Sequence, residues 1–198
     1  MGVQSVLWRF ALRSPRGKER KGKIMDMNKF KKLVHYICWS YSSSPSKLGA
    51  VKLNKALWLS DLTAYYALGH PITGARYIKR EFGPVPKPIL PVIRELVDEG
   101  VLTVQETLCF GKTKREFIVH RDATEEFMTD AERTIVKDTI EFVCEKHTAT
   151  SISSASHDHI WKAAVDGEEI PHFTVFAQPG TITPEDRIWA LGKIENAC

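Results

Sequence analysis

The sequence predicts a single, helix-dominated α+β domain with one small antiparallel β-hairpin and a winged-helix-like middle section. Apolar side chains recur at helical spacing through most of the chain, which indicates amphipathic helices. Two runs rich in β-branched and aromatic residues flank residues 111–114, a pattern typical of a hairpin. Three helices followed by a hairpin is the order of a winged helix. The 198 residues, 43% of them hydrophobic, suffice for one core and an additional arm.

The first two expected helices cover residues 28–41 and 51–68. The first has one apolar stripe, and Asn28 is suited to its N-cap position. The second is apolar around almost its whole circumference, which predicts a helix in the centre of the domain. Gly69 fits the position just after its last turn, and Pro71 prevents the helix from continuing.

One acidic residue, Asp61, lies within this central apolar helix. A buried carboxylate is stable only when hydrogen bonds or a cation compensate for its lost hydration. We therefore expect Asp61 to make a structural ion pair or hydrogen bond with a nearby cation, either Arg76 or Lys79.

The next segment, GHPITGARYIKREFGPVPKPILP (residues 69–91), combines three glycines and five prolines with bulky apolar residues. Such a segment is rigid, because proline restricts the backbone even before folding. Tyr77 and Phe82 are aromatic anchors of the kind enriched at interface centres, with Lys79 and Arg80 available for a polar rim. The alternative is that Tyr77 and Phe82 belong to the core and that the prolines shape a loop.

A third helix is expected to begin near Leu90 and to end at Gly100. The hairpin after it has a basic tip formed by Lys112, Lys114 and Arg115, which suggests either DNA binding or contact with a protein partner. In a winged helix the third helix reads the DNA, but here it carries three acids that would repel phosphates: Glu95, Asp98 and Glu99. The sequence therefore argues against strong DNA binding by this part of the chain.

Three further helices are expected in the C-terminal half. A Thr-x-x-Glu capping box at residues 129–132 opens the first, and the serines of residues 151–156 are expected to interrupt the helical pattern. A short helix then follows in the stretch SHDHIWKAA, capped by Ser156 or His157. The sequence TPED at residues 183–186 predicts a final helix, because it places a proline and two acids in the first turn.

The positive net charge of +4 is concentrated at the N-terminus. The first 32 residues hold ten lysines and arginines against two acids, so the remaining chain is acidic by four charges. We expect residues 1–25 to be a basic arm and residues 26–198 to be the folded domain, with any DNA binding limited to the arm. The four cysteines form no CxxC pair, which fits a cytoplasmic protein, and no apolar run is long enough for a membrane span.

Motifs of catalysis are missing from the sequence. It has no phosphate-binding loop, no G-x-S-x-G elbow and no H-E-x-x-H motif. His157 and His159 are two residues apart, and on a helix their side chains would point in nearly opposite directions. We therefore expect no catalytic residue, no metal ligand and no cofactor, and we do not expect an enzyme.

The central helix and the segment after it resemble a known family. The stretch KLNKALWLSDLTAYYALGHPITGARYIKREFGPVPKPI is similar to the signature of the Panacea domain, also called the SocA-like antitoxin domain. That signature combines a K-L-x-K helix containing an aspartate, a G-x-P-I-T-G turn and a G-P-V motif. The matching positions are Lys52, Leu53, Lys55, Asp61, Gly69, Pro71, Ile72, Thr73, Gly74, Tyr77, Phe82, Gly83, Pro84 and Val85.

The resemblance implies an antitoxin of a bacterial or phage toxin–antitoxin system, which neutralises its cognate toxin by direct protein contact without catalysis. It also implies one alternative, an adaptor that delivers the toxin to an ATP-dependent protease. A winged-helix-like DNA-binding regulator is a third hypothesis, suggested by the order of the elements. The motif residues expected to be structural are Asp61, Gly69, Pro71, Gly74, Gly83 and Pro84.

Overall fold

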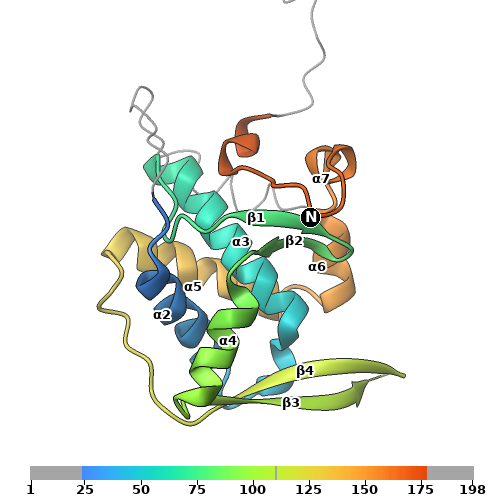
Figure 1. Ribbon diagram of the computed structural model, residues 1–198. Coiled ribbons are helices and arrows are strands. Elements are labelled where there is room, and N and C mark those ends of the chain that lie inside the picture. Colours follow the sequence, from blue (N-terminus) through green and yellow to red (C-terminus); the bar gives the residue numbers. More distant parts are fainter. Residues whose placement is uncertain (1–23, 110, 178–198) are drawn as a thin grey trace, which may run out of the picture.

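The computed structural model describes residues 24–109 and 111–177. Within these ranges the chain forms a helix-dominated α+β domain, as the sequence predicts (Figure 1). The basic arm lies almost entirely outside the described residues, and the predicted final helix after residue 183 lies wholly outside them. In chain order the elements are α2 (Met27–Trp39), η1 (Pro45–Lys47), α3 (Gly49–Leu68), β1 (Tyr77–Arg80), β2 (Gly83–Pro86), α4 (Ile89–Asp98), β3 (Leu102–Cys109), β4 (Lys112–Val119), α5 (Asp130–Glu145), α6 (Ala149–Ser156), α7 (His159–Ala163) and η2 (His172–Phe176).

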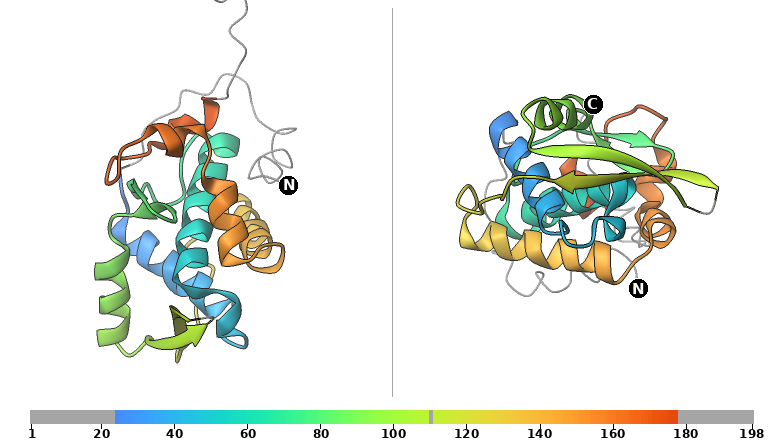
Figure 2. Two further views of the ribbon diagram at one scale, coloured as in Figure 1. Left: turned by 90° about the vertical axis from the view of Figure 1, so that its right-hand side faces the viewer. Right: turned by 90° about the horizontal axis from the view of Figure 1, so that it is seen from below.

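Helix α3 is the central element, which confirms the prediction from its all-round apolar sequence. Most of its residues from Leu53 to Ala64 are buried, and the other elements surround it (Figures 1 and 2). Hairpin β1–β2 packs against α3, and hairpin β3–β4 lies beside its N-terminal end. Gly69 adopts the left-handed conformation, with φ of 84°, and its N–H donates to the Tyr65 carbonyl. This glycine therefore ends α3 as expected.

Helix α2 begins at Met27, and its cap is Asp26 rather than the predicted Asn28. The Asp26 carboxylate accepts a hydrogen bond from the Lys29 N–H at 2.9 Å. Both residue types are good N-caps, so the sequence alone does not distinguish them. The Asp26 N–H also donates to the Thr73 carbonyl at 2.9 Å, and this long-range contact selects Asp26 as the cap.

The proline-rich segment contains a second β-hairpin, so the expectation of only one hairpin was wrong. Strands β1 and β2 pair antiparallel, with Arg80 opposite Gly83 across a two-residue turn. Along an antiparallel hairpin, hydrogen-bonded and non-hydrogen-bonded residue pairs alternate, and the pair next to a two-residue turn is hydrogen-bonded. Gly83 and Val85 therefore donate their N–H groups to β1. Pro84 and Pro86 occupy the positions whose N–H would face away from β1. Their missing donors therefore cost the ladder nothing, and a strand with two prolines is possible.

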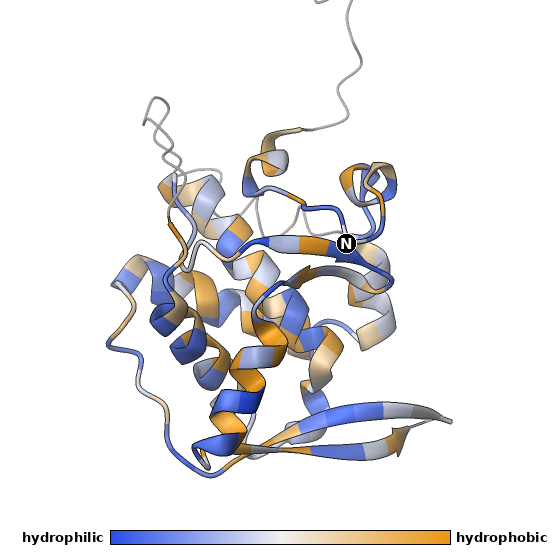
Figure 3. Ribbon diagram, in the orientation of Figure 1, coloured by the Kyte–Doolittle hydropathy of each residue, from blue (hydrophilic) through white to orange (hydrophobic). Residues whose placement is uncertain are grey.

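Helix α4 and hairpin β3–β4 form where the sequence places them. Strand β3 pairs with β4 in one continuous antiparallel register, with Leu102 opposite Val119 at the base and Cys109 opposite Lys112 near the tip. At the base, Leu102 and Phe117 are buried. The outer half of β4 is hydrophilic (Figure 3). The hairpin therefore joins the core at its base only.

In the C-terminal half the capping box at Thr129 and Glu132 is confirmed at the start of α5. The predicted interruption at residues 151–156 was wrong, because α6 occupies this stretch. Ser151 is the N3 residue of a second capping box, opened by Thr148, so the serines begin a helix there. The short helix α7 is capped by Asp158, and not by Ser156 or His157. No helix in the described ranges is both long and apolar enough to cross a membrane.

Candidate partner-binding surface

The turn between β1 and β2, residues Arg80–Gly83, presents the residues that the sequence suggested for partner contact. We call this turn the hairpin apex. Phe82 at the apex is 52% exposed, which is unusual for a large aromatic side chain. Arg80 beside it is also exposed, and its guanidinium pairs with Asp166 at 2.9 Å. An apolar ring flanked by a charged side chain is thus offered to solvent.

Side chains of α6 and α7 donate hydrogen bonds to backbone carbonyls of the hairpin apex. The Ser153 hydroxyl donates to the Phe82 carbonyl, and the Trp161 indole N–H donates to the Arg80 carbonyl, both at 3.1 Å. The Trp161 ring is itself fixed, because it stacks on His157 with ring centroids 3.6 Å apart. The Lys79 ammonium lies 4.2 Å from the centre of the Trp161 ring. Two carbonyls of the turn are therefore anchored on rigid side chains.

Residues 167–170, which follow α7, form backbone hydrogen bonds with the edge of β1 that faces away from β2. The Lys79 N–H donates to the Glu168 carbonyl at 2.8 Å, and the Lys79 carbonyl accepts from the Gly167 N–H at 3.0 Å. Farther along, the Ile170 N–H donates to the Tyr77 carbonyl at 2.8 Å. Strand β1 thus lies between β2 and residues 167–170. This double pairing gives the hairpin apex little freedom to move.

A buried lysine, Lys55 of α3, lies directly beneath the hairpin apex. Its side chain is 1% exposed, and its Nζ has no hydrogen-bond partner in the described ranges. A Cβ atom placed on Gly83 would lie only 1.6 Å from this Nζ and 2.9 Å from the Ser156 hydroxyl. Gly83 also has φ of 109°. The G-P-V motif thus needs glycine both for its backbone conformation and to leave room for Lys55.

Burial lowers the pKa of the Lys55 ammonium to about 7, while the charge of Asp158 opposes this shift. In an unfolded chain a lysine has a pKa of about 10.4. Above pH 7 the folded state therefore binds fewer protons at Lys55 than the unfolded state does. It follows that the free energy of unfolding rises with pH in this range.

This linkage leads to a test of Lys55. Between pH 7 and 8.5 we expect the change in the free energy of unfolding to be about 1.5 kcal/mol more positive in the unmodified chain than in Lys55→Met, which keeps an apolar side chain of similar length. The raised pKa values of the buried Cys38 and Cys144 thiols lower the stability with rising pH in this window, but they act equally in both proteins. The lowered pKa values of His147, His157 and His172 act below this window. Urea unfolding at several pH values measures the slope, and equal slopes in the two proteins would contradict a neutral Lys55.

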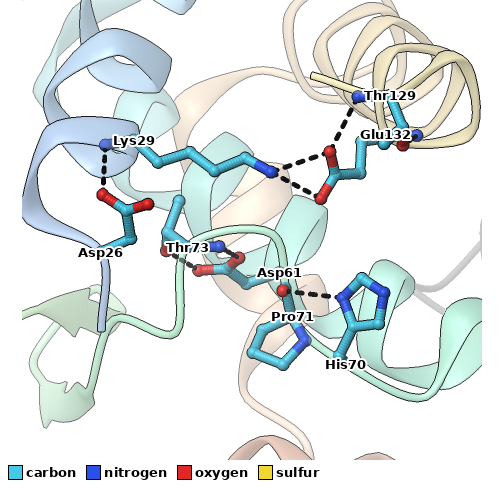
Figure 4. A network of polar contacts seen from close by, with 8 residues as sticks. All are labelled: Asp26, Lys29, Asp61, His70, Pro71, Thr73, Thr129 and Glu132. Carbon is cyan, nitrogen blue, oxygen red and sulfur yellow. Dashed lines mark hydrogen bonds and ion pairs between the residues drawn. The ribbon is translucent and has the colours of Figure 1, made fainter. Parts of the chain in front are cut away.

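Asp61 is buried, as expected, but it makes no ion pair with Arg76 or Lys79, so that prediction was wrong. Its carboxylate accepts hydrogen bonds from the Thr73 N–H at 2.8 Å, the Thr73 hydroxyl at 2.5 Å and the Tyr77 hydroxyl at 2.9 Å (Figure 4 shows the Thr73 bonds). These donors come from the turn after α3 and from β1. Asp61 therefore ties the start of the hairpin segment to the central helix.

Two of the expected contact residues are turned away from a partner. Tyr77 is 1% exposed and donates its hydroxyl to Asp61, so it belongs to the core. Burial, reinforced by the Asp61 charge, raises the pKa of Tyr77 well above its ordinary value. Lys79 is half-buried, and its Nζ donates to the Ala164 carbonyl at 2.8 Å. Of the four expected contact residues in this segment, Arg80 and Phe82 are thus the exposed ones.

The basic residues at the β3–β4 tip are engaged within the chain where their side chains are described. Lys114 donates to the Ser46 carbonyl and pairs with Glu116, while Arg115 pairs with Glu106 at 3.0 Å. The side chain of Lys112 lies outside the described residues. They belong to the second hairpin, which lies apart from the β1–β2 hairpin and its apex (Figure 1). The two sets of predicted contact residues therefore form separate surfaces.

The acids of α4 also take part in ion pairs. Lys31 of α2 contacts Glu95 at 2.7 Å and Glu99 at 2.6 Å, which joins the two helices. Asp98 is exposed on the same helix. A helix surface with this charge pattern presents no cationic face to DNA phosphates.

The residues expected to be structural are either buried or have a positive φ. Asp61, Pro71 and Pro84 are buried, whereas Gly69, Gly74 and Gly83 have positive φ. Sequence reasoning missed the supports of the hairpin apex: Lys55, Ser153 and Trp161. The available signals for Lys55 were its place in the K-L-x-K motif and the presence of a lysine within an all-round apolar helix, whereas no pattern marked Ser153.

The family model described as "Antitoxin SocA-like, Panacea domain" matches residues 53–162. The matched stretch begins on α3 and ends on α7, so it includes the hairpin apex together with Lys55, Ser153 and Trp161 beneath it. Searches of the curated proteins and of the solved structures gave no match. Because the family match spans more than half of the 198 residues, the chain belongs to the SocA-like antitoxin family with the Panacea domain, which supports a general role as an antitoxin that has a toxin as its partner.

Proposed function

We propose that this protein neutralises a cognate toxin by direct binding, without catalysis, and that the hairpin apex is the centre of the contact surface. The observation that carries the proposal is the exposed Phe82 ring on a turn that is anchored from two sides. Aromatic residues surrounded by polar groups contribute most of the free energy in many protein interfaces. The family membership supplies the class of partner, a toxin protein.

The rigidity of the turn supports a binding role. Binding costs conformational entropy whenever a loop must become ordered on contact. At the hairpin apex that order exists beforehand, because Ser153 and Trp161 hold its carbonyls and β1 is paired on both sides. Arg80 supplies an exposed charge next to the ring, suited to the rim of an interface.

Phe82→Ala tests the proposal. The variant is expected to fold normally, because the ring is half-exposed, and to bind the toxin of a neighbouring gene about 10- to 100-fold more weakly. In co-expression it should fail to restore growth. Phe173→Ala on η2 is the matched control, since it removes an aromatic ring that is 62% exposed elsewhere on the domain. It should bind and neutralise like the unmodified chain.

Two readings of this experiment separate the possible mechanisms. A toxin that is inhibited but stays at a constant level supports neutralisation by sequestration. A toxin that disappears only in cells with an active ATP-dependent protease supports delivery for proteolysis. If Phe82→Ala and Phe173→Ala bind equally well, the contact surface lies elsewhere.

A further inference from the structure

A second exposed apolar side chain lies on the segment that supports the hairpin apex. Val165, which follows α7, is 72% exposed, more than Phe82 at the apex. It begins a tight turn at residues 165–168, which we call the second turn. The Glu168 N–H donates to the Val165 carbonyl at 2.9 Å, and the Glu168 carboxylate accepts from the Val165 N–H at 2.6 Å. The backbone of Val165 is thus held on both sides while its side chain faces solvent.

Lys79 of β1 joins the second turn to the hairpin apex. Its carbonyl accepts from the Gly167 N–H at 3.0 Å, and its Nζ donates to the Ala164 carbonyl at 2.8 Å. The next residue, Arg80, forms the ion pair with Asp166 at 2.9 Å. The left-hand view of Figure 2 shows α7, which precedes the second turn, above the end of hairpin β1–β2. The two turns therefore form one composite surface, and both are anchored before any partner arrives.

The charges on this composite surface are mainly acidic. The exposed charged residues of the two turns are Arg80, Glu81, Asp166 and Glu168. One base and three acids give a net charge of −2. Beside them, Asp158 and Lys162 of α7 and its cap cancel each other. A surface of this charge repels a second copy of itself and favours a partner whose contact surface is cationic.

We propose that the toxin contacts both turns at once, with Val165 as a second apolar anchor beside Phe82, and that its own contact surface is apolar at the centre and basic at the rim. This inference rests on the proposed function and adds to it the second anchor and the chemistry of the partner. Protein interfaces commonly combine apolar residues at the centre with charged residues at the rim. The Arg80–Asp166 ion pair joins the two turns, so a partner has to match their spacing in order to reach both anchors.

Val165→Ala tests the second anchor. The variant should fold normally, because the side chain is exposed in the free protein, and should bind the product of the neighbouring toxin gene about 5- to 15-fold more weakly. Leu108→Ala is the matched control, since it shortens an aliphatic side chain that is 84% exposed on β3. It should bind like the unmodified chain. Equal losses in Val165→Ala and Leu108→Ala would overturn the assignment of Val165.

Glu81→Lys tests the chemistry of the partner. The change places a base on the hairpin apex, so a cationic toxin surface should bind at least about 10-fold more weakly at low salt. Added NaCl should narrow this difference, because salt screens exposed charges. Glu126→Lys makes the same charge change at an exposed position before α5 and should bind like the unmodified chain. Tighter binding by Glu81→Lys would indicate an acidic toxin surface and overturn the proposed chemistry.

The combined outcomes distinguish this inference from the proposed function. If Phe82→Ala weakens binding and Val165→Ala does not, the hairpin apex alone contacts the toxin, so the proposed function stands and the second anchor is wrong. If Phe82→Ala binds normally, the hairpin apex is not the centre of the contact and both fail, whatever Val165→Ala does. Both also fail if the product of the neighbouring gene does not bind the unmodified chain.

Discussion

Gly83→Ala is expected to destabilise the fold by about 4 kcal/mol, enough to remove a large part of the stability of a small domain. Its Cβ would lie 1.6 Å from the buried Lys55 Nζ and 2.9 Å from the Ser156 hydroxyl. Lysine side chains usually move aside easily, but Lys55 is enclosed on all sides. The backbone at φ of 109° adds strain for any residue with a Cβ. Chemical denaturation measures the loss.

Two controls separate the steric effect from the backbone strain. Gly69→Ala also adds a Cβ at positive φ, but nothing lies within 4 Å of it, so we expect a loss of only about 1–2 kcal/mol. In the background of Lys55→Ala, Gly83→Ala should cost less than it does alone, because the Nζ is gone. Equal costs for Gly83→Ala in both backgrounds would show that Lys55 does not determine the requirement for glycine.

Asp61→Ala is expected to destabilise the protein by about 4 kcal/mol as well. The change leaves three donors without their acceptor, namely the N–H and hydroxyl of Thr73 and the hydroxyl of Tyr77. Each unsatisfied buried donor costs about 1–3 kcal/mol. The first hairpin begins at Tyr77, so the loss should also loosen the hairpin. Thermal unfolding and hydrogen exchange at β1 residues would detect both effects.

Two further variants isolate the contribution of the hydrogen bonds that Asp61 accepts. Asp98→Ala removes an exposed acid from α4 and should change the stability by less than about 0.5 kcal/mol. Thr73→Val removes one hydroxyl donor and leaves the N–H in place, so its effect should be intermediate. If Asp61→Ala is no more harmful than Asp98→Ala, the buried carboxylate is not a structural centre.

The parts of the fold that depend on local patterns could be predicted from the sequence. Helix α3 follows from its continuous apolar surface, and α5 follows from the capping box at Thr129. Hairpin β3–β4 follows from alternating residues around Gly111. In each case the information lies within one turn of helix or one pair of strands, which is the range over which periodicity operates.

Features set by contacts distant in sequence could not be predicted. Propensity argues against a strand with Pro84 and Pro86, and only the pairing with β1 shows that the backbone nitrogens of both prolines point away from β1. A carboxylate in a helix suggested a cation, yet the donors to Asp61 are the uncharged Thr73 and Tyr77. No helical pattern shows which lysine of α3 lies under the turn at Gly83.

The pairing of β1 on both sides has a consequence for synthesis on the ribosome. The supports of the hairpin apex are Ser153, Trp161 and residues 167–170, whereas the turn itself is made more than 70 residues earlier. While residue 170 is still inside the exit tunnel, the turn that carries Phe82 lacks these supports. Contacts of such long sequence separation form late, because the intervening chain must first be ordered. The surface we assign to toxin contact is therefore completed only after residue 170 has left the exit tunnel, when the central helix already has most of its other neighbours.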